Sequence, residues 1–101
     1  MFVIRRTETF QKWISQLRGR RAAARLASRI LRAEDGNLGD VKPVGDGVEE
    51  MRIDYGPGYR VYFMRHGLVL IVLLVGGDKS TQRRDIHEAR RLCAEWKAAN
   101  L

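Results

Sequence analysis

The sequence has little cysteine, proline or histidine, and it contains no long apolar run. Its single cysteine, Cys93, excludes an internal disulfide and cannot supply a cysteine-rich zinc site. The longest unbroken apolar stretch, residues 68–75, has eight residues, whereas a helix needs about 20 to span a bilayer. The apolar opening at residues 1–4 is too short for the core of a signal peptide. We therefore expect a soluble, cytoplasmic protein that does not engage a membrane.

Histidines are too few to suggest a metal site. The two that are present, His66 and His87, do not combine with any aspartate or glutamate at metal-ligand spacing. We therefore expect neither a metal nor another cofactor. His87 falls in the first turns of the last predicted helix, where it is either a surface residue or a general acid or base.

Acidic side chains are in the minority, and the charge is unevenly spread. The chain has 19 Lys and Arg against 12 Asp and Glu, for a formal net charge of +7. Residues 1–32 carry nine basic side chains and one acidic one, whereas residues 33–54 carry two basic and seven acidic ones. Such segregation can steer a polyanion or an acidic protein, although a plain solvated basic face would give the same pattern.

What is present is the composition of one globular domain of 101 residues. Residues 2–6 are predicted to form a strand, and Thr7 can cap the helix that follows it. Gly19 separates this helix from a second one, and apolar residues recur at helical spacing in both. These residues are Phe10, Trp13, Ile14 and Leu17 in the first helix and Ala23, Leu26, Ala27, Ile30 and Leu31 in the second. The second helix carries on its predicted outer face Arg21, Arg25, Arg29 and Arg32.

Beyond position 36 the apolar pattern becomes that of strands. Four strands are predicted, at residues 38–44, 50–55, 59–65 and 68–75. Pro43 suits an edge strand, and the continuous apolar run of the last strand suits a central position. A last helix is predicted from Ser80 or Thr81 to about Lys97. The predicted class is α+β, with an N-terminal strand and helical hairpin, an antiparallel meander sheet with the helices on one side, and a C-terminal helix.

Two arginines are predicted to stand side by side on this sheet. Arg52 and Arg60 lie on neighbouring antiparallel strands, on either side of a turn, so their like charges repel unless an anion or a carboxylate lies between them. Either Glu50 and Asp54 neutralise them, or a phosphate does.

A glycine-containing segment after residue 75, Gly-Gly-Asp-Lys-Ser-Thr, extends this predicted site. It is not a nucleoside-triphosphate loop, because Leu73 and Asp78 stand where that motif needs glycine. Gly76 and Gly77 would let the backbone approach a ligand closely, and Lys79 would add a charge beside the free N–H groups of a helix N-terminus. The other interpretation is a simple strand–turn–helix with a solvated lysine.

Two sequence blocks carry a family resemblance. The first is residues 56–63, Gly-Pro-Gly-Tyr-Arg-Val-Tyr-Phe, and the second is residues 74–82, Leu-Val-Gly-Gly-Asp-Lys-Ser-Thr-Gln, followed by Asp-Ile at 85–86. In this order they resemble the addiction-module killer branch of the RelE/ParE toxin superfamily, close to HigB-like toxins. The predicted helical hairpin also stands where that superfamily has one, so the resemblance covers essentially the whole chain. It implies a microbial-ribonuclease-like fold and the toxin of a type II toxin–antitoxin system.

The resemblance further implies a metal-independent endoribonuclease that cuts messenger RNA on the ribosome. In this chemistry the ribose 2′-hydroxyl attacks the adjacent phosphate. On the resemblance, Arg60 stabilises the transition state, Lys79 and Arg52 contact phosphates, and Arg83 and Arg84 hold RNA.

One position departs from the RelE pattern. RelE-type nucleases carry a tyrosine early in the last helix, and this chain has Ile86 and His87 there. Either His87 or Tyr62 takes over proton transfer, or charge stabilisation suffices, or the chain does not cleave RNA efficiently. Tyr62 is also a candidate for stacking on RNA, although strand aromatics commonly serve packing.

Two other functions therefore stay open. One is a ParE-like toxin that acts on DNA gyrase through protein contacts, and the other is a degenerate member that only binds a partner. The resemblance also implies an acidic antitoxin, of the helix-turn-helix DNA-binding kind. We expect it on the basic hairpin, at Arg21, Arg25, Arg29 and Arg32.

Overall fold

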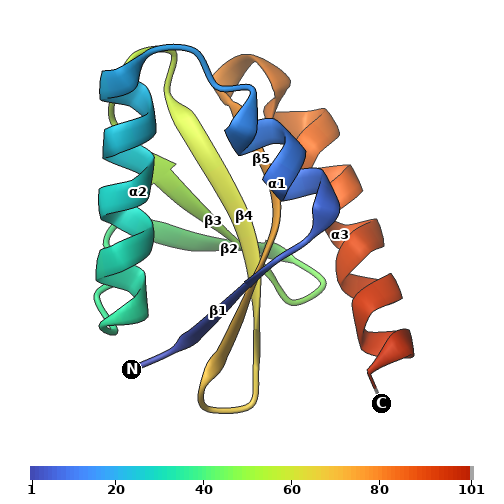
Figure 1. The fold of residues 1–101 in the computed structure, drawn as a ribbon. Coiled ribbons are helices and arrows are strands. Elements are labelled where there is room, and N and C mark those ends of the chain that lie inside the picture. The colour runs from blue at the N-terminus through green and yellow to red at the C-terminus, as the bar shows by residue number, and fades with distance from the viewer. Residues whose placement is uncertain (101) are drawn as a thin grey trace.

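A five-stranded sheet with the strand order β1-β5-β4-β3-β2 forms the centre of the fold (Figure 1). The computed structural model describes residues 1–100. Its elements are β1 (Val3–Arg6), α1 (Glu8–Ser15), α2 (Arg20–Glu34), β2 (Val41–Gly45), β3 (Val48–Ile53), β4 (Tyr59–His66), β5 (Leu70–Asp78), a 3-10 turn (Lys79–Thr81) and α3 (Gln82–Ala99). The predicted α+β class and the predicted order of elements are confirmed. No helix within residues 1–100 is long and apolar enough to cross a membrane.

Strands β2 to β5 form the predicted antiparallel meander, and β1 adds a parallel strand at one edge of the sheet. Each of the three consecutive pairs from β2 to β5 is antiparallel. Strand β1 instead pairs with β5 in parallel. A parallel pair needs a long crossover connection, which the helical hairpin and the intervening strands supply here. The sheet is therefore mixed.

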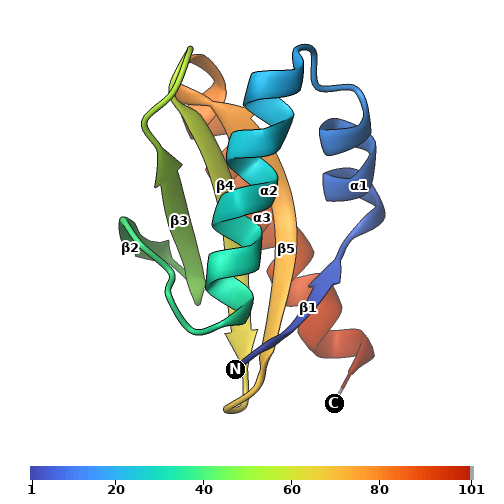
Figure 2. The ribbon, with the colours of Figure 1, turned by 60° about the vertical axis from the view of Figure 1, so that its left-hand side comes forward.

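Helices cover both faces of the sheet, so the expectation that they lie on one side is wrong (Figure 2). Helices α1 and α2 bury Phe10 and Leu26 against one face, together with Phe63. Helix α3 buries Ala89 and Cys93 against the other face. Because β5 contributes to both cores, its apolar run is continuous instead of alternating.

Helix α1 has the predicted N-cap, but α2 buries a different face from the one that the sequence predicts. The Thr7 hydroxyl accepts a hydrogen bond from the Phe10 N–H at 3.0 Å, which confirms the predicted N-cap of α1. The buried residues of α2 are Ala22, Leu26, Ile30 and Ala33. Ala23, Ala27 and Leu31 face solvent, contrary to the prediction. The three consecutive alanines at 22–24 allow the apolar stripe to be drawn along two neighbouring faces, and tertiary packing selects one of them.

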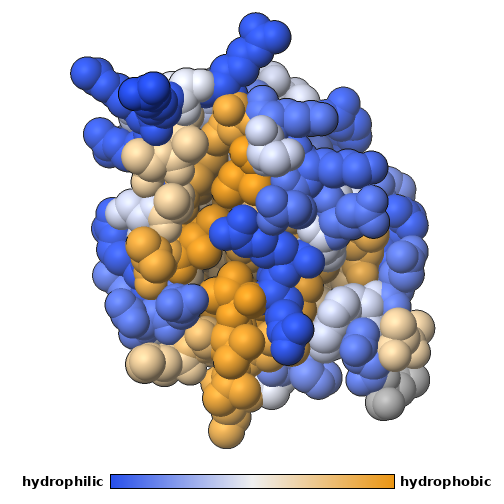
Figure 3. Space-filling view, in the orientation of Figure 1, coloured by the Kyte–Doolittle hydropathy of each residue, from blue (hydrophilic) through white to orange (hydrophobic). Residues whose placement is uncertain are grey.

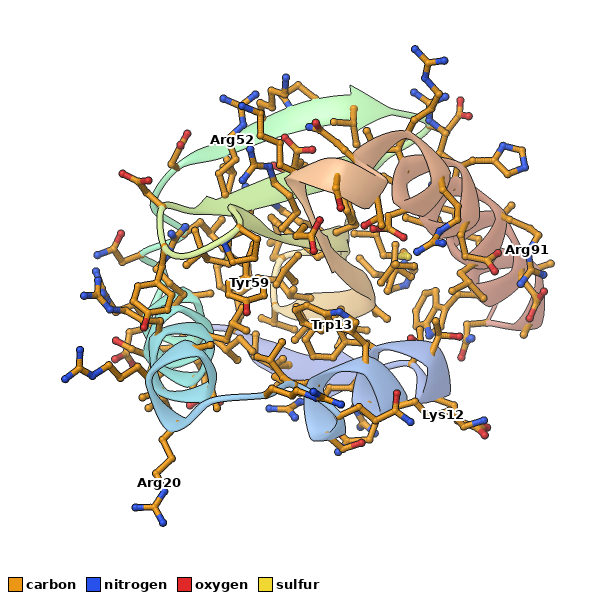
Figure 4. All side chains as sticks on the ribbon, turned by 90° about the horizontal axis from the view of Figure 1, so that it is seen from above. Lys12, Trp13, Arg20, Arg52, Tyr59 and Arg91 are labelled. Carbon is orange, nitrogen blue, oxygen red and sulfur yellow. The ribbon has the colours of Figure 1, made fainter. Side chains whose placement is uncertain are left out.

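Gly76 and Gly77 belong to β5, which continues to Asp78, and both glycines are buried. A Cβ on Gly76 would overlap the indole ring of Trp13, and a Cβ on Gly77 would overlap the carboxylate of Asp85. Figure 4 shows Trp13 reaching from α1 toward the sheet. The glycines therefore make room for side chains of this chain, which corrects the expectation that their backbone approaches a phosphate.

The close fit at Gly76 gives a stability prediction. Gly76→Ala should lower the free energy of unfolding by about 2–3 kcal/mol, because the new methyl group overlaps the ring of Trp13. Urea denaturation followed by circular dichroism measures this change. In a Trp13→Ala background the same substitution should cost much less, because the ring is gone. An equal cost in both backgrounds would contradict the packing role.

Candidate phosphate-binding site

The predicted pair of arginines is present, and a lysine joins it. Arg52 on β3 and Arg60 on β4 are directly opposite each other in the antiparallel ladder. Both line a polar pocket of about 310 Å³ with Lys79, which follows β5. The other lining residues are Asp40, Asp54 and Gly58. The three cations that the sequence singles out therefore meet at one place.

A buried carboxylate lies directly behind these cations. Glu50 has no exposed surface. Its carboxylate accepts hydrogen bonds from Arg52 Nε at 3.0 Å, the Tyr62 hydroxyl at 3.0 Å and Gln82 Nε2 at 2.6 Å. Arg60 Nε lies 3.9 Å from the same carboxylate. These five residues, which we call the Glu50 cluster, join β3, β4 and the first turn of α3.

The Glu50 cluster shifts the ionisation of two of its members in opposite directions. Burial by itself raises the pKa of Glu50. Hydrogen bonds from Gln82, Arg52 and Tyr62 oppose it, as does the charge of Arg60, so the pKa of Glu50 lies below its ordinary value. Burial, followed by the charge and the hydrogen bond of Glu50, raises the pKa of Tyr62. At neutral pH the cluster therefore holds a carboxylate and a neutral phenol that donates to it.

The guanidinium of Arg60 is held at one end by backbone carbonyls. Its Nη1 donates to the carbonyl oxygens of Gly58 at 3.1 Å and Tyr59 at 3.2 Å. Its Nε is buried and has no hydrogen-bond partner among residues 1–100. The side chain of Arg60 is 13% exposed, against 36% for Arg52. Arg60 is thus the inner and Arg52 the outer cation of the pocket.

Of the two carboxylates expected to neutralise the arginines, only Glu50 does so. Within the described part of the chain, Asp54 forms no ion pair, and neither does Lys79. Asp40 and Asp54 are exposed, so water screens their charges. The pocket therefore has one inner cation, Arg60, and two more accessible ones, Arg52 and Lys79, and its lining carboxylates are open to solvent.

Sequence reasoning missed the contribution of α3 to this site. Gln82 and Asp85 both turn toward the sheet from the first turn of α3, where Asp85 is buried and accepts a hydrogen bond from the Thr81 hydroxyl at 2.5 Å. Their spacing of three residues places them on one helix face and was the available indication. In the sequence this spacing stands beside two cations, Arg83 and Arg84, which are the more typical mark of a polyanion site.

The other side chains predicted to contact RNA do not line this pocket. Tyr62 is fully buried, so the expectation that it stacks on RNA is corrected. His87 is exposed and lines an open depression with Arg83 and Arg84. Within residues 1–100, this depression and the cation pocket share no lining residue. His87 is therefore not part of the Arg60 site.

One of the four arginines expected on the outer face of α2 has a structural role instead. Arg29 donates to the carbonyl oxygens of Arg52 at 2.6 Å and Leu38 at 3.1 Å, and so ties α2 to the sheet. This corrects its assignment to a partner-binding surface. The other three predicted residues, Arg21, Arg25 and Arg32, are exposed, as is Arg20 at the start of α2.

The fold and the pocket together define a small basic α+β protein with a cation cluster at the end of its meander sheet. The chain is 51% identical over 92 residues to an uncharacterized protein of Haemophilus influenzae, an alignment that covers 91% of this chain and 93% of that protein. The chain belongs to the family of that protein. No family model matches the chain.

The ionisation of Glu50 predicts how its contribution to the free energy of unfolding depends on pH. The pKa of Glu50 is lowered in the folded chain, so its contribution to stability is fully present above the unfolded value of about 4.3 and is lost as the pH falls through the folded value. Glu50→Gln should therefore cost about 2–4 kcal/mol at pH 7, because three donors lose a charged acceptor, and less as the pH falls below about 4.

Urea denaturation at several pH values measures this difference. Glu49→Gln is the matched control, because Glu49 lies beside Glu50 on β3 but pairs with the exposed Arg65. Its cost should be at most about 1 kcal/mol. A cost of Glu50→Gln that stays constant from pH 7 to pH 3 would contradict the ionised state of Glu50.

Proposed function

We propose that this chain is the toxin of a type II toxin–antitoxin module and cleaves messenger RNA on the ribosome without a metal. The observation that carries the proposal is the meeting of Arg52, Arg60 and Lys79 in one pocket. The net charge of +7 supports it, because it draws the chain toward a polyanion. So does the likeness of the two sequence blocks around Arg60 and Lys79 to RelE/ParE toxins.

In this reaction the ribose 2′-hydroxyl attacks the adjacent phosphorus and expels the 5′-oxygen. The products are a 2′,3′-cyclic phosphate and a free 5′-hydroxyl. Negative charge grows on the phosphoryl oxygens in the transition state, and fixed cations stabilise it most when they need not reorganise. Arg60, which is held by two carbonyls and faces Glu50, suits that role. Arg52 and Lys79 suit contacts to the scissile and neighbouring phosphates.

Proton transfer needs another group, since Tyr62 is buried with a raised pKa and His87 lies outside the pocket. The exposed carboxylates of Asp40 and Asp54 line the pocket and can accept the proton of the 2′-hydroxyl, while solvent water protonates the departing 5′-oxygen. In this proposal they replace Tyr62 and His87 as candidate bases.

The same observation favours a second candidate. A ParE-like toxin acts on DNA gyrase through protein contacts and needs no proton-transfer group. A cation pocket without a histidine or tyrosine among the residues that line it fits such a toxin. Gyrase-dependent DNA damage with intact messages is the outcome that separates it from the nuclease.

Either toxin would act in the cytoplasm and be silenced by an acidic antitoxin, of the helix-turn-helix DNA-binding kind. The start of α2 suits such a partner. Its first turn contains Arg20 and Arg21 and no acidic residue, and Gly19 offers no side-chain cap. Positive charge at a helix N-terminus is unfavourable, so an acidic partner would relieve it. Figure 3 shows hydrophilic side chains gathered at this end of the molecule.

Loss of Arg60 tests the nuclease. Expression of the wild-type chain should arrest growth and create new 5′ ends in messenger RNA. Arg60→Ala should lower the rate of cleavage by about 10²–10³-fold, because the transition state loses a fixed cation. Arg65→Ala, which removes an exposed arginine from the same strand, should leave cleavage unchanged. Growth arrest with intact messages would refute the nuclease.

Charge reversal on α2 tests the partner surface. The double substitution Arg21→Glu, Arg25→Glu should weaken binding of the protein encoded by the neighbouring gene by at least about tenfold at low salt, and less at high salt. Lys97→Glu on α3, at the other face of the sheet, should change the affinity little. Titration calorimetry at two salt concentrations measures both. Binding that is insensitive to salt and to the α2 substitutions would place the partner elsewhere.

A further inference from the structure

The two oxygens of Glu50 have different neighbours. The cations lie nearest to Oε1: Arg52 Nε donates to it at 3.0 Å, and Arg60 Nε lies 3.9 Å away, beyond hydrogen-bond distance. The neutral donors both bind Oε2, with the Tyr62 hydroxyl at 3.0 Å and Gln82 Nε2 at 2.6 Å. One oxygen thus faces the cations, and the other is anchored to β4 and α3.

This division matters because the two arginines oppose each other in the ladder. Two guanidinium groups on directly opposite residues repel, and flexible side chains relieve the repulsion by turning apart. A shared oxygen between their Nε groups offsets the repulsion. It accepts the Nε–H of Arg52, so that within residues 1–100 both Nη groups of Arg52 stay available for another anion, and it attracts Arg60 by charge from 3.9 Å without a hydrogen bond.

We propose that Glu50 is the positioning residue of the cation pocket. Its carboxylate fixes Arg52 and Arg60 together in the geometry that a phosphate requires. This inference rests on the proposed function, because it takes an RNA phosphate as the ligand. Glu50 itself is fully buried and does not touch the ligand. It acts through the two arginines, while Tyr62 and Gln82 fix Glu50.

For the change in RNA affinity when Glu50 loses its charge, a positioning role and a purely electrostatic role predict opposite signs. Removal of a negative charge near the pocket should strengthen RNA binding if only the net field mattered. Removal of the positioning group should weaken it, because a neutral amide has one acceptor oxygen and turns an N–H group toward other donors. Glu49→Gln removes the same charge from the same strand and leaves the arginine pair untouched, so it isolates the field effect.

The experiment measures binding of an unstructured 12-nucleotide RNA at several salt concentrations, with every 2′-hydroxyl methylated to prevent cleavage. For Glu50→Gln we expect affinity about tenfold weaker than wild type and a shallower dependence of log K on log salt, by about 0.7 for each phosphate that the variant no longer neutralises. For Glu49→Gln we expect an unchanged slope and equal or tighter binding.

A variant whose population is partly unfolded is recognised by the salt dependence of its RNA binding. Loss of folded molecules lowers the binding amplitude but leaves the salt slope of the remaining molecules unchanged. Gln82→Ala provides a second variant, because it removes one anchor of Oε2 without changing any charge. It should shift both the affinity and the slope in the same direction as Glu50→Gln, by less.

The NMR resonances of the Nε–Hε groups of Arg52 and Arg60 report on the contact with Glu50 in the absence of RNA. Glu50→Gln should shift both, and Glu49→Gln should shift neither. Wild-type resonances and a wild-type salt slope in Glu50→Gln would overturn the proposal. If Arg52→Ala and Arg60→Ala leave the wild-type slope unchanged, the proposed function fails, and the resonances still decide whether Glu50 holds both guanidinium groups.

Discussion

A carboxylate buried at the end of the sheet is the constraint around which the other elements of this fold are arranged. Desolvation of an ionised carboxylate costs several kcal/mol unless donors surround it. The donors to Glu50 are brought together by the register of the β3–β4 pair and by the position at which α3 begins. In the β3–β4 ladder Glu50 stands opposite Tyr62, and Arg52 stands opposite Arg60. A slip of one residue would turn these side chains to the other face. Gln82 completes the set only because α3 begins close to the sheet.

Gly77 is what allows α3 to begin there. It lies on β5 beside Arg60, and its missing side chain leaves room for the buried carboxylate of Asp85. The glycine therefore serves the cation pocket indirectly, through the approach of a helix. In the sequence, a glycine that meets a ligand and a glycine that meets a side chain look the same. The partner of Gly76 is Trp13, more than sixty positions away, so no local pattern could have identified it.

The parts of the fold that could be predicted are those with local causes. Strand alternation, helical periodicity and turn glycines gave the order of elements and placed Arg52 next to Arg60. The parallel pairing of β1 and the covering of both faces depend on contacts between distant segments, so the sequence left them undetermined. Arg29 shows the same limit within a helix. Its spacing matches that of the exposed arginines, yet two carbonyl acceptors outside α2 draw it inward.

Apolar residues in place of a buried ionic cluster commonly give equal or greater stability, so stability alone does not account for Glu50 and its donors. What such a cluster provides is fixed geometry. Two guanidinium groups in a preset position lose little freedom when an anion arrives, whereas mobile arginines must be ordered at that moment. Transition-state stabilisation and tight binding both benefit from such cations. The cluster therefore supports an anion site more firmly than it supports a nuclease, and the proton-transfer group is the feature that distinguishes the two.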